Sequence, residues 1–119
     1  MGIGPVPAVR TALKRAGVTR GQVDVIELNE AFAAQSLAVI DELGLDEERV
    51  NPHGGAIALG HPIGATGRAI TSKPLDEHER RDMGIGLVTL CIGGGQGIAL
   101  LLARVNRHSD RSHCRVDTD

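Results

Sequence analysis

The sequence predicts an α/β fold. Helix-like and strand-like segments alternate along its 119 residues, and the short runs at 23–28 and 87–92 are rich in valine, isoleucine and leucine. A chain of this length makes one small domain or a piece of a larger one. Its core must be aliphatic, because Phe32 is the only aromatic residue.

The first helix is expected at residues 5–16, and a strand is expected at 23–28. The prolines of this helix fall in its first turn, where a missing N–H costs no hydrogen bond. Gly17 stands where a left-handed cap ends a helix. Residues 23–28 alternate loosely between apolar and polar side chains, which favours a strand.

The second helix is expected from Glu30 to Leu43, with Asn29 as its N-cap and Gly44 as its stop. Two more strands are expected at 87–92 and 97–105. The glycine turn that separates them predicts antiparallel pairing.

Two segments fit a packed domain poorly. Between Thr71 and Met83 few residues are strongly apolar, and Pro74 falls in what would be a helix interior, where proline costs about 3 kcal/mol. We therefore expect a helix that packs badly here. The stretch 106–119 is almost entirely polar and is expected to be a disordered tail.

Composition excludes several classes of function. A chain with 13 basic and 15 acidic residues has no basic footprint for duplex nucleic acid, and a single aromatic offers no platform for stacked bases. Two cysteines make no disulfide scaffold, which favours a reducing, cytoplasmic setting. We see neither a secretory leader nor an apolar run long enough to span a membrane. The glycine runs also lack the dinucleotide and P-loop patterns.

The glycines cluster around His61, in the sequence Gly60-His61-Pro62. Of the 16 glycines, many fall in 54–67 and 93–97, which indicates tight loops. A histidine between a glycine-rich loop and a helix-starting proline is well held to act as a general base. The alternative is a histidine that only hydrogen-bonds its own loop. His78, in a polar stretch, is expected to be solvated, as are His108 and His113.

Cys91 and Asn29 are the other candidates for chemistry. Cys91 ends an apolar strand and precedes three glycines, whose exposed N–H groups suit an oxyanion. Its thiol is a candidate nucleophile or acid–base group, and the alternative is a buried structural cysteine. Asn29 lies at a strand-to-helix junction, where α/β active sites gather polar groups, although simple N-capping is the favoured reading from composition.

Three blocks occurring together resemble the C-terminal domain of the thiolases, the acetyl-CoA acetyl- and acyltransferases. They are Asn29-Glu-Ala-Phe-Ala, the stretch from Asn51-Pro-His-Gly-Gly to Gly60-His-Pro-Ile-Gly-Ala-Thr-Gly, and Cys91-Ile-Gly-Gly-Gly-Gln-Gly. The likeness runs from about Met1 to Val105. It implies a thiolase-like fold with a mixed sheet and packed helices, with an incomplete C-terminal domain at 1–105.

The resemblance implies roles for individual residues. His61 would activate a nucleophilic cysteine and help to form an oxyanion hole. Cys91 would shuttle the proton at the substrate α-carbon, and Asn29 would hold a water that completes the oxyanion hole. The N–H of Gly93 would support a second oxyanion hole.

The resemblance also implies what the site binds. Ala31 and Phe32 would lie along the pantetheine arm of CoA. CoA thioesters are substrates, in thiolysis of 3-ketoacyl-CoA or in acetyl-CoA condensation, and neither a metal nor a resident cofactor is expected.

The chain departs from the thiolase pattern in several respects. The upstream half of the family's C-terminal domain and most of its CoA-contacting loop have no counterpart here, and the stretch 106–119 has none in the family. The family's nucleophilic cysteine belongs to the N-terminal domain, and neither Cys91 nor Cys114 can replace it. Where thiolases carry an apolar-faced helix, residues 71–78 read Thr-Ser-Lys-Pro-Leu-Asp-Glu-His. The isolated chain is therefore expected to be inactive. The alternatives are a non-catalytic remnant or interaction module, and a subunit completed in trans by a complementing thiolase chain or within a homo-oligomer.

Overall fold

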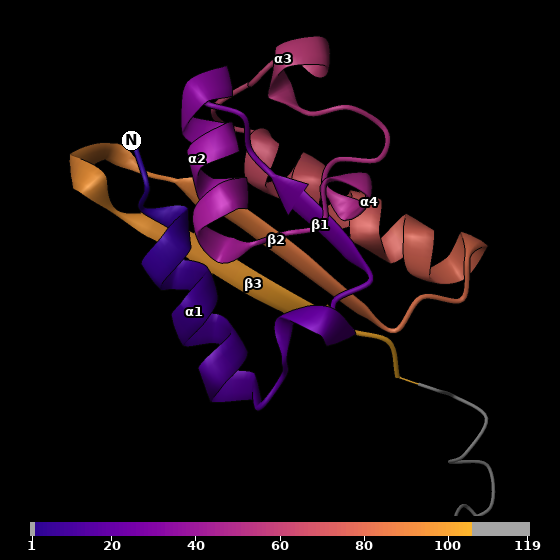
Figure 1. Ribbon diagram of the computed structural model, residues 1–119. Helices are drawn as coiled ribbons and strands as arrows, with labels where there is room; N and C mark the ends of the chain where they lie inside the picture. The colour runs from indigo at the N-terminus through magenta and orange to yellow at the C-terminus, as the bar shows by residue number, and fades with distance from the viewer. Residues whose placement is uncertain (1, 106–119) are drawn as a thin grey trace, which may run out of the picture.

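The computed structural model describes residues 2–105 as a three-stranded mixed sheet with helices on both faces (Figure 1). The strands, in the spatial order β1-β2-β3, are β1 (Val25–Leu28), β2 (Ile85–Cys91) and β3 (Gly97–Ala103). Strand β1 pairs with β2 in parallel, and β2 pairs with β3 antiparallel. The helices are α1 (Pro5–Ala16), α2 (Ala33–Leu43), α3 (Ala56–Leu59) and α4 (Thr66–Arg80). The predicted α/β fold and the predicted hairpin are thus confirmed.

Helices α1 and α2 cover one face of the sheet and form the main core with it. Side chains alternate between the two faces of a strand, so Ile26 and Leu28 of β1 share this face with their neighbour Leu87 of β2. The helices contribute buried aliphatic side chains to the same cluster, chiefly Val6 and Val9 of α1 and Val39 and Leu43 of α2.

Helix α4 packs on the opposite face, against β1 and β2. Its buried side chains include Ile70 and Pro74. Gly86 of β2 makes the close approach possible, because a Cβ at that position would lie 2.7 Å from the Cβ of Pro74. Within residues 2–105 no element covers strand β3 on this face, where Ile98 and Leu100 are 51% and 44% exposed.

The expectation of a poorly packed segment at 71–83 is wrong for most of its length. Helix α4 runs through Pro74 without a break and ends at Arg80, and Pro74 is fully buried against the sheet. The expectation that His78 is solvated is also wrong, since His78 is only 4% exposed. Gly86 leaves room for the side chains of Pro74 and His78, since a Cβ at position 86 would lie 3.3 Å from His78 Nε2. The local composition of residues 71–83 could not show this.

Helix α2 begins later than predicted, and Asn29 is not its N-cap. The helix starts at Ala33 with Phe32 as the N-cap residue, and Gly44 ends it in the left-handed conformation as expected. Asn29 instead continues the sheet ladder, because its backbone N–H donates to the Thr89 carbonyl oxygen at 3.0 Å. The predicted tail at 106–119, including Cys114, lies outside the described residues. In residues 2–105 no helix combines the length and the apolar character needed to span a membrane.

Candidate active site

Asn29 and Cys91 lie at the same end of the sheet. Leu28 pairs with Thr89 in the parallel register, so the chain leaves β1 at Asn29 directly beside the last residues of β2, which end at Cys91. The carboxyl ends of parallel strands are where α/β proteins place their ligands. The two residues, far apart in sequence, therefore meet at a suitable edge. Cys91 is half-buried and carries a free thiol.

The Asn29 side chain is buried with an unused acceptor. Asn29 is 3% exposed, and its Oδ1 has no hydrogen-bond partner among residues 2–105. Leaving a buried polar atom unpaired costs about 1–3 kcal/mol, so such atoms usually mark a place where a water or ligand binds. Asn29 Oδ1 is thus ready to accept a hydrogen bond from a bound molecule.

His61 is exposed in the loop that joins α3 to α4. Its Nδ1 lies 2.7 Å from Thr66 Oγ1, at the start of α4. Figure 1 shows α3 and the beginning of α4 at the end of the sheet toward which the β1 arrow points. The loop between α3 and α4, which contains His61, therefore lies at the end of the sheet where β1 ends. In the described part of the chain no hydrogen bond joins the side chains of His61, Asn29 and Cys91.

The remaining predicted site residues are accessible. Gly93 opens a short 3₁₀ turn (Gly93–Gly95), is exposed, and has open space where a Cβ would stand. Phe32 is 57% exposed, which is unusual for the only aromatic side chain. Ala31 is half-buried, and its N–H donates to the Asn29 carbonyl oxygen at 3.1 Å. Gly93 thus leaves its backbone accessible to a ligand, and Phe32 offers an accessible apolar surface.

Sequence reasoning missed a clamp formed by Asn51 and Glu30 around Asn29. The Asn51 side chain accepts from the Leu28 N–H (2.9 Å) and donates to the Leu28 carbonyl (2.8 Å) and to Glu30 Oε1 (3.2 Å). Glu30 Oε2 accepts from the N–H of Ile57 in α3 at 2.9 Å. The residues before and after Asn29 are therefore both held, and α3, which leads to His61, is tied to them.

The backbone of Asn51 is a further sign of this clamp. Its φ of 47° lies in the left-handed region, where only glycine is comfortable, although asparagine tolerates it better than most residues. Asn51 directly precedes a proline and a glycine pair, a pattern typical of a loop start. That pattern was the available signal, but it did not reveal the contacts to β1.

A second feature that sequence reasoning missed is an ion pair between Lys73 and Glu27, next to the glycine-rich loop. Lys73 Nζ of α4 lies 3.0 Å from Glu27 Oε2 of β1 and donates to the Gly54 carbonyl oxygen at 2.8 Å. Glu27 is 1% exposed, and its other oxygen has no partner in the described residues. Burial raises the pKa of Glu27, and the Lys73 ammonium opposes that rise. The signal in the sequence was Glu27 itself, because a carboxylate inside the apolar run 23–28 needs a partner of opposite charge.

His53 and Glu77 form a third link between the loop and α4. His53 Nε2 lies 2.6 Å from Glu77 Oε1, and Arg81 approaches the other oxygen at 3.4 Å. The hydrogen bond from His53 is the main cause that holds the pKa of Glu77 below its ordinary value. The Glu77 side chain is 3% exposed, whereas that of His53 is 52% exposed. The pair therefore fastens the start of the glycine-rich loop to the helix.

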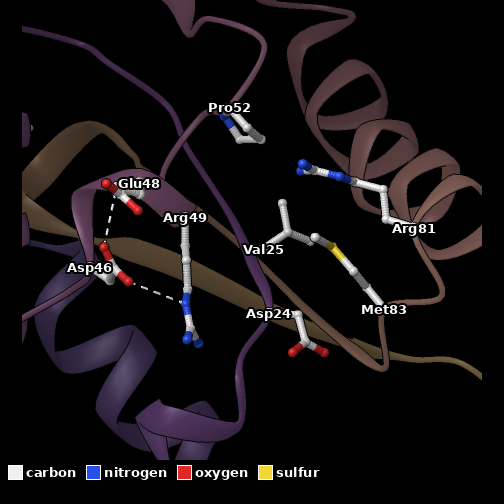
Figure 2. Close-up of a pocket in the computed structure, with 8 residues that line it drawn as sticks. All are labelled: Asp24, Val25, Asp46, Glu48, Arg49, Pro52, Arg81 and Met83. Carbon is white, nitrogen blue, oxygen red and sulfur yellow. Dashed lines mark hydrogen bonds and ion pairs between the residues drawn. The ribbon is translucent and has the colours of Figure 1, made fainter.

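A surface hollow of about 490 Å³ lies elsewhere, at the amino end of β1 (Figure 2). Most of its charged side chains already have partners. Arg49 contacts Asp46 at 3.3 Å and donates to the Val23 carbonyl at 2.8 Å, and Asp24 accepts from the N–H groups of Gly84 and Ile85. The hollow contains none of the predicted site residues. Within residues 2–105 there is also no group of three or more His, Cys, Asp or Glu residues arranged to hold a metal ion.

Comparison with known proteins identifies the family. The family described as "Thiolase, C-terminal domain" matches residues 1–104. An acetyl-CoA acetyltransferase of Pseudomonas aeruginosa is 65% identical over 104 residues, covering 87% of this chain and 26% of that protein. A beta-ketothiolase of Cupriavidus necator is 60% identical over 105 residues, covering 88% of this chain and 27% of that protein.

The solved structures agree with this assignment. The crystal structure of the Bacillus anthracis acetyl-CoA acetyltransferase superposes with a TM-score of 0.84 at 48% identity, covering 87% of this chain and 26% of that one. The chain spans about a quarter of the length of the relatives it matches. The family match covers nearly all of the described residues, and the fold superposes on that of a solved acetyl-CoA acetyltransferase. The chain therefore belongs to the thiolase family.

Proposed function

We propose that this chain supplies the C-terminal part of a thiolase active site, which transfers acyl groups between CoA thioesters. The observation that carries the proposal is the buried, unpaired Oδ1 of Asn29 at the edge of the sheet where β2 ends at Cys91. A water held by that oxygen would donate to a thioester oxygen that becomes negatively charged. His61, in the loop that follows α3, is the second candidate donor.

The proton chemistry is assigned to Cys91. In the condensation direction its thiolate takes the α-proton of an acyl-CoA. The resulting carbanion forms the new carbon–carbon bond with an acyl carbon, while the bond from that carbon to a nucleophilic cysteine sulfur breaks. Thiolysis of a 3-ketoacyl-CoA runs through the same steps in reverse. Gly93 N–H stabilises the oxyanion of the acyl-transfer step, and Ala31 with exposed Phe32 contacts the pantetheine arm.

The 119-residue chain by itself should have no turnover, because the nucleophilic cysteine that forms the acyl-enzyme is not among its residues that match the family. The test is steady-state thiolysis of acetoacetyl-CoA. The purified chain is assayed alone and after co-expression with the part of the P. aeruginosa acetyl-CoA acetyltransferase outside the matched region.

The expected result is activity only in the co-expressed pair, with loss on His61→Ala or Cys91→Ala. Turnover by the chain alone, above a His61→Ala control, contradicts the predicted inactivity. A stable co-purifying pair without turnover contradicts the proposed function.

The second candidate function is a non-catalytic interaction module, and the uncovered face of β3 favours it. Ile98 and Leu100 expose apolar surface on that face of the strand. Exposed apolar patches promote association. Sedimentation velocity of the purified chain separates the possibilities. Self-association that Leu100→Lys abolishes supports the module, whereas a monomer that unfolds cooperatively counts against it.

A further inference from the structure

The side chain of Thr66 lies against the ring of His61. Thr66 is the first residue of α4 and is 3% exposed. Its Oγ1 is 2.7 Å from His61 Nδ1 and 3.0 Å from the Pro62 carbonyl oxygen. The hydroxyl is therefore placed between a ring nitrogen and a backbone acceptor.

A hydroxyl has only one hydrogen to donate, so its two contacts cannot both use it. The carbonyl oxygen of Pro62 can only accept, and the contact to it is the back-bond that a helical threonine makes to the carbonyl four residues earlier. Thr71 makes the same back-bond in the same helix, from Oγ1 to the Gly67 carbonyl at 2.6 Å. The same carbonyl oxygen also accepts from the N–H groups of Ala65 and Thr66, both at 2.8 Å. Where the hydroxyl hydrogen is directed to Pro62 as well, Thr66 Oγ1 accepts from His61 Nδ1–H.

We propose that Thr66 is a positioning residue that holds neutral His61 as the Nδ1–H tautomer. The lone pair then resides on Nε2, which has no hydrogen-bond partner among residues 2–105. Since His61 itself is exposed, that nitrogen is open to an incoming group. The other tautomer would place the lone pair on Nδ1, where the Thr66 side chain blocks access.

The tautomer determines what His61 can do first. With the lone pair on Nε2, His61 takes a proton from a thiol brought to it and then, as imidazolium, donates from the same atom to an oxyanion. The role in catalysis rests on the proposed function, whereas the tautomer itself does not. The two are therefore tested by different measurements.

The test is a long-range ¹H–¹⁵N NMR spectrum of the His61 ring in the 119-residue chain, recorded in alkaline buffer. The expected spectrum has a protonated Nδ1 and an unprotonated Nε2. Thr66→Val removes the acceptor and should shift the tautomer ratio toward Nε2–H about fivefold, the equivalent of one ordinary hydrogen bond. Thr66→Ser should restore the wild-type ratio.

Thr71→Val is the matched control, because it removes the same kind of back-bond from the same helix without touching His61. It should leave the ring spectrum unchanged. A wild-type ring protonated on Nε2, or an unchanged ratio in folded Thr66→Val, overturns the proposal. If Thr66→Val does not fold, the wild-type and Thr66→Ser spectra alone decide.

In the co-expressed pair, Thr66→Val should lower kcat and leave KM unchanged, and Thr66→Ser should recover kcat. An inactive pair with the expected ring spectrum rejects the proposed function but keeps the tautomer assignment. An active pair in which the His61 ring is protonated on Nε2 supports the proposed function but rejects the tautomer assignment.

Discussion

The Lys73 ammonium of α4 reaches the buried Glu27 carboxylate of β1 at 3.0 Å and so fastens the helix to the sheet. Removing one partner of a buried ion pair leaves an uncompensated charge and costs about 3 kcal/mol or more. We therefore expect Lys73→Met to lower the free energy of unfolding by about 3 kcal/mol. Urea denaturation measures it.

The ion-pair prediction has two controls. Lys14→Met changes an exposed lysine of α1 and should stay within about 0.5 kcal/mol of wild type. Glu27→Gln combined with Lys73→Met removes both charges and should recover most of the loss. A double variant as unstable as Lys73→Met would show that the pair is not what holds α4.

The His53–Glu77 hydrogen bond should make stability depend on pH in acid. Because this bond holds the pKa of Glu77 below its ordinary value of 4.5, the unfolded chain binds more protons than the folded chain as pH falls past that value. The contribution of Glu77 is full above pH 4.5 and is lost as pH falls through the lower folded pKa. We expect His53→Gln to be less stable than wild type at neutral pH, with the difference vanishing in acid.

Urea unfolding at a series of pH values measures this difference. The raised pKa of Glu27 acts in the opposite direction. Its main causes, burial and the opposing Lys73 ammonium, are common to both proteins, and His53 adds only a smaller lowering, so most of this effect cancels in the comparison. His61→Gln, which removes a histidine without a carboxylate partner, should show no such pH dependence. A constant difference between His53→Gln and wild type from acid to neutral pH would refute the assignment.

Replacing Pro74 by alanine should stabilise the protein. Alanine restores a backbone donor inside α4 and relieves a helix cost of about 3 kcal/mol, while losing two buried methylenes worth about 0.8 kcal/mol each. The net gain should be about 1 kcal/mol, read from thermal unfolding. Pro7→Ala, in the first turn of α1, should change little, because that N–H has no helical partner. A destabilised Pro74→Ala variant would mean that the ring's packing outweighs the missing hydrogen bond.

Gly86 should tolerate no side chain. An added Cβ would stand 2.7 Å from Pro74 Cβ and 3.3 Å from His78 Nε2, so Gly86→Ala must push α4 away from the sheet. We expect a loss of about 2 kcal/mol, typical of overpacking. At Gly84 the nearest atom would be Asp24 Oδ2, at an ordinary 3.5 Å, so Gly84→Ala is the matched control. Equal stabilities of the two variants would contradict the close packing of α4.

Local patterns in the sequence predict the elements of this fold but not how they meet. Gly17 and Gly44 end their helices in the left-handed conformation, as the sequence predicts. Pro74 misleads, because the stabilisation of α4 comes from Glu27 and Gly86, which are distant in sequence. Long-range contacts thus override a poor local propensity.

The candidate site shows the same division. The residues proposed for chemistry are found by their types and by the family likeness, and the placement of Asn29 and Cys91 at one end of the sheet follows from the parallel register of β1 and β2. The supports of Asn29 are not readable in advance. Asn51 and Glu30 act through backbone atoms of Leu28 and Ile57, and no pattern of side-chain types reports such bonds.

The parallel pairing of β1 with β2 has a consequence for how the protein is made. All of α2, α3 and α4 lies between the two strands in sequence, so their pairing closes a long loop and belongs to the slow class of folding events. During synthesis the N–H of Asn29 has no strand partner until Thr89 has left the ribosome. Until that moment the apolar strand β1 is without its neighbour, and the nascent chain is most exposed to capture by chaperones or by other unfolded chains.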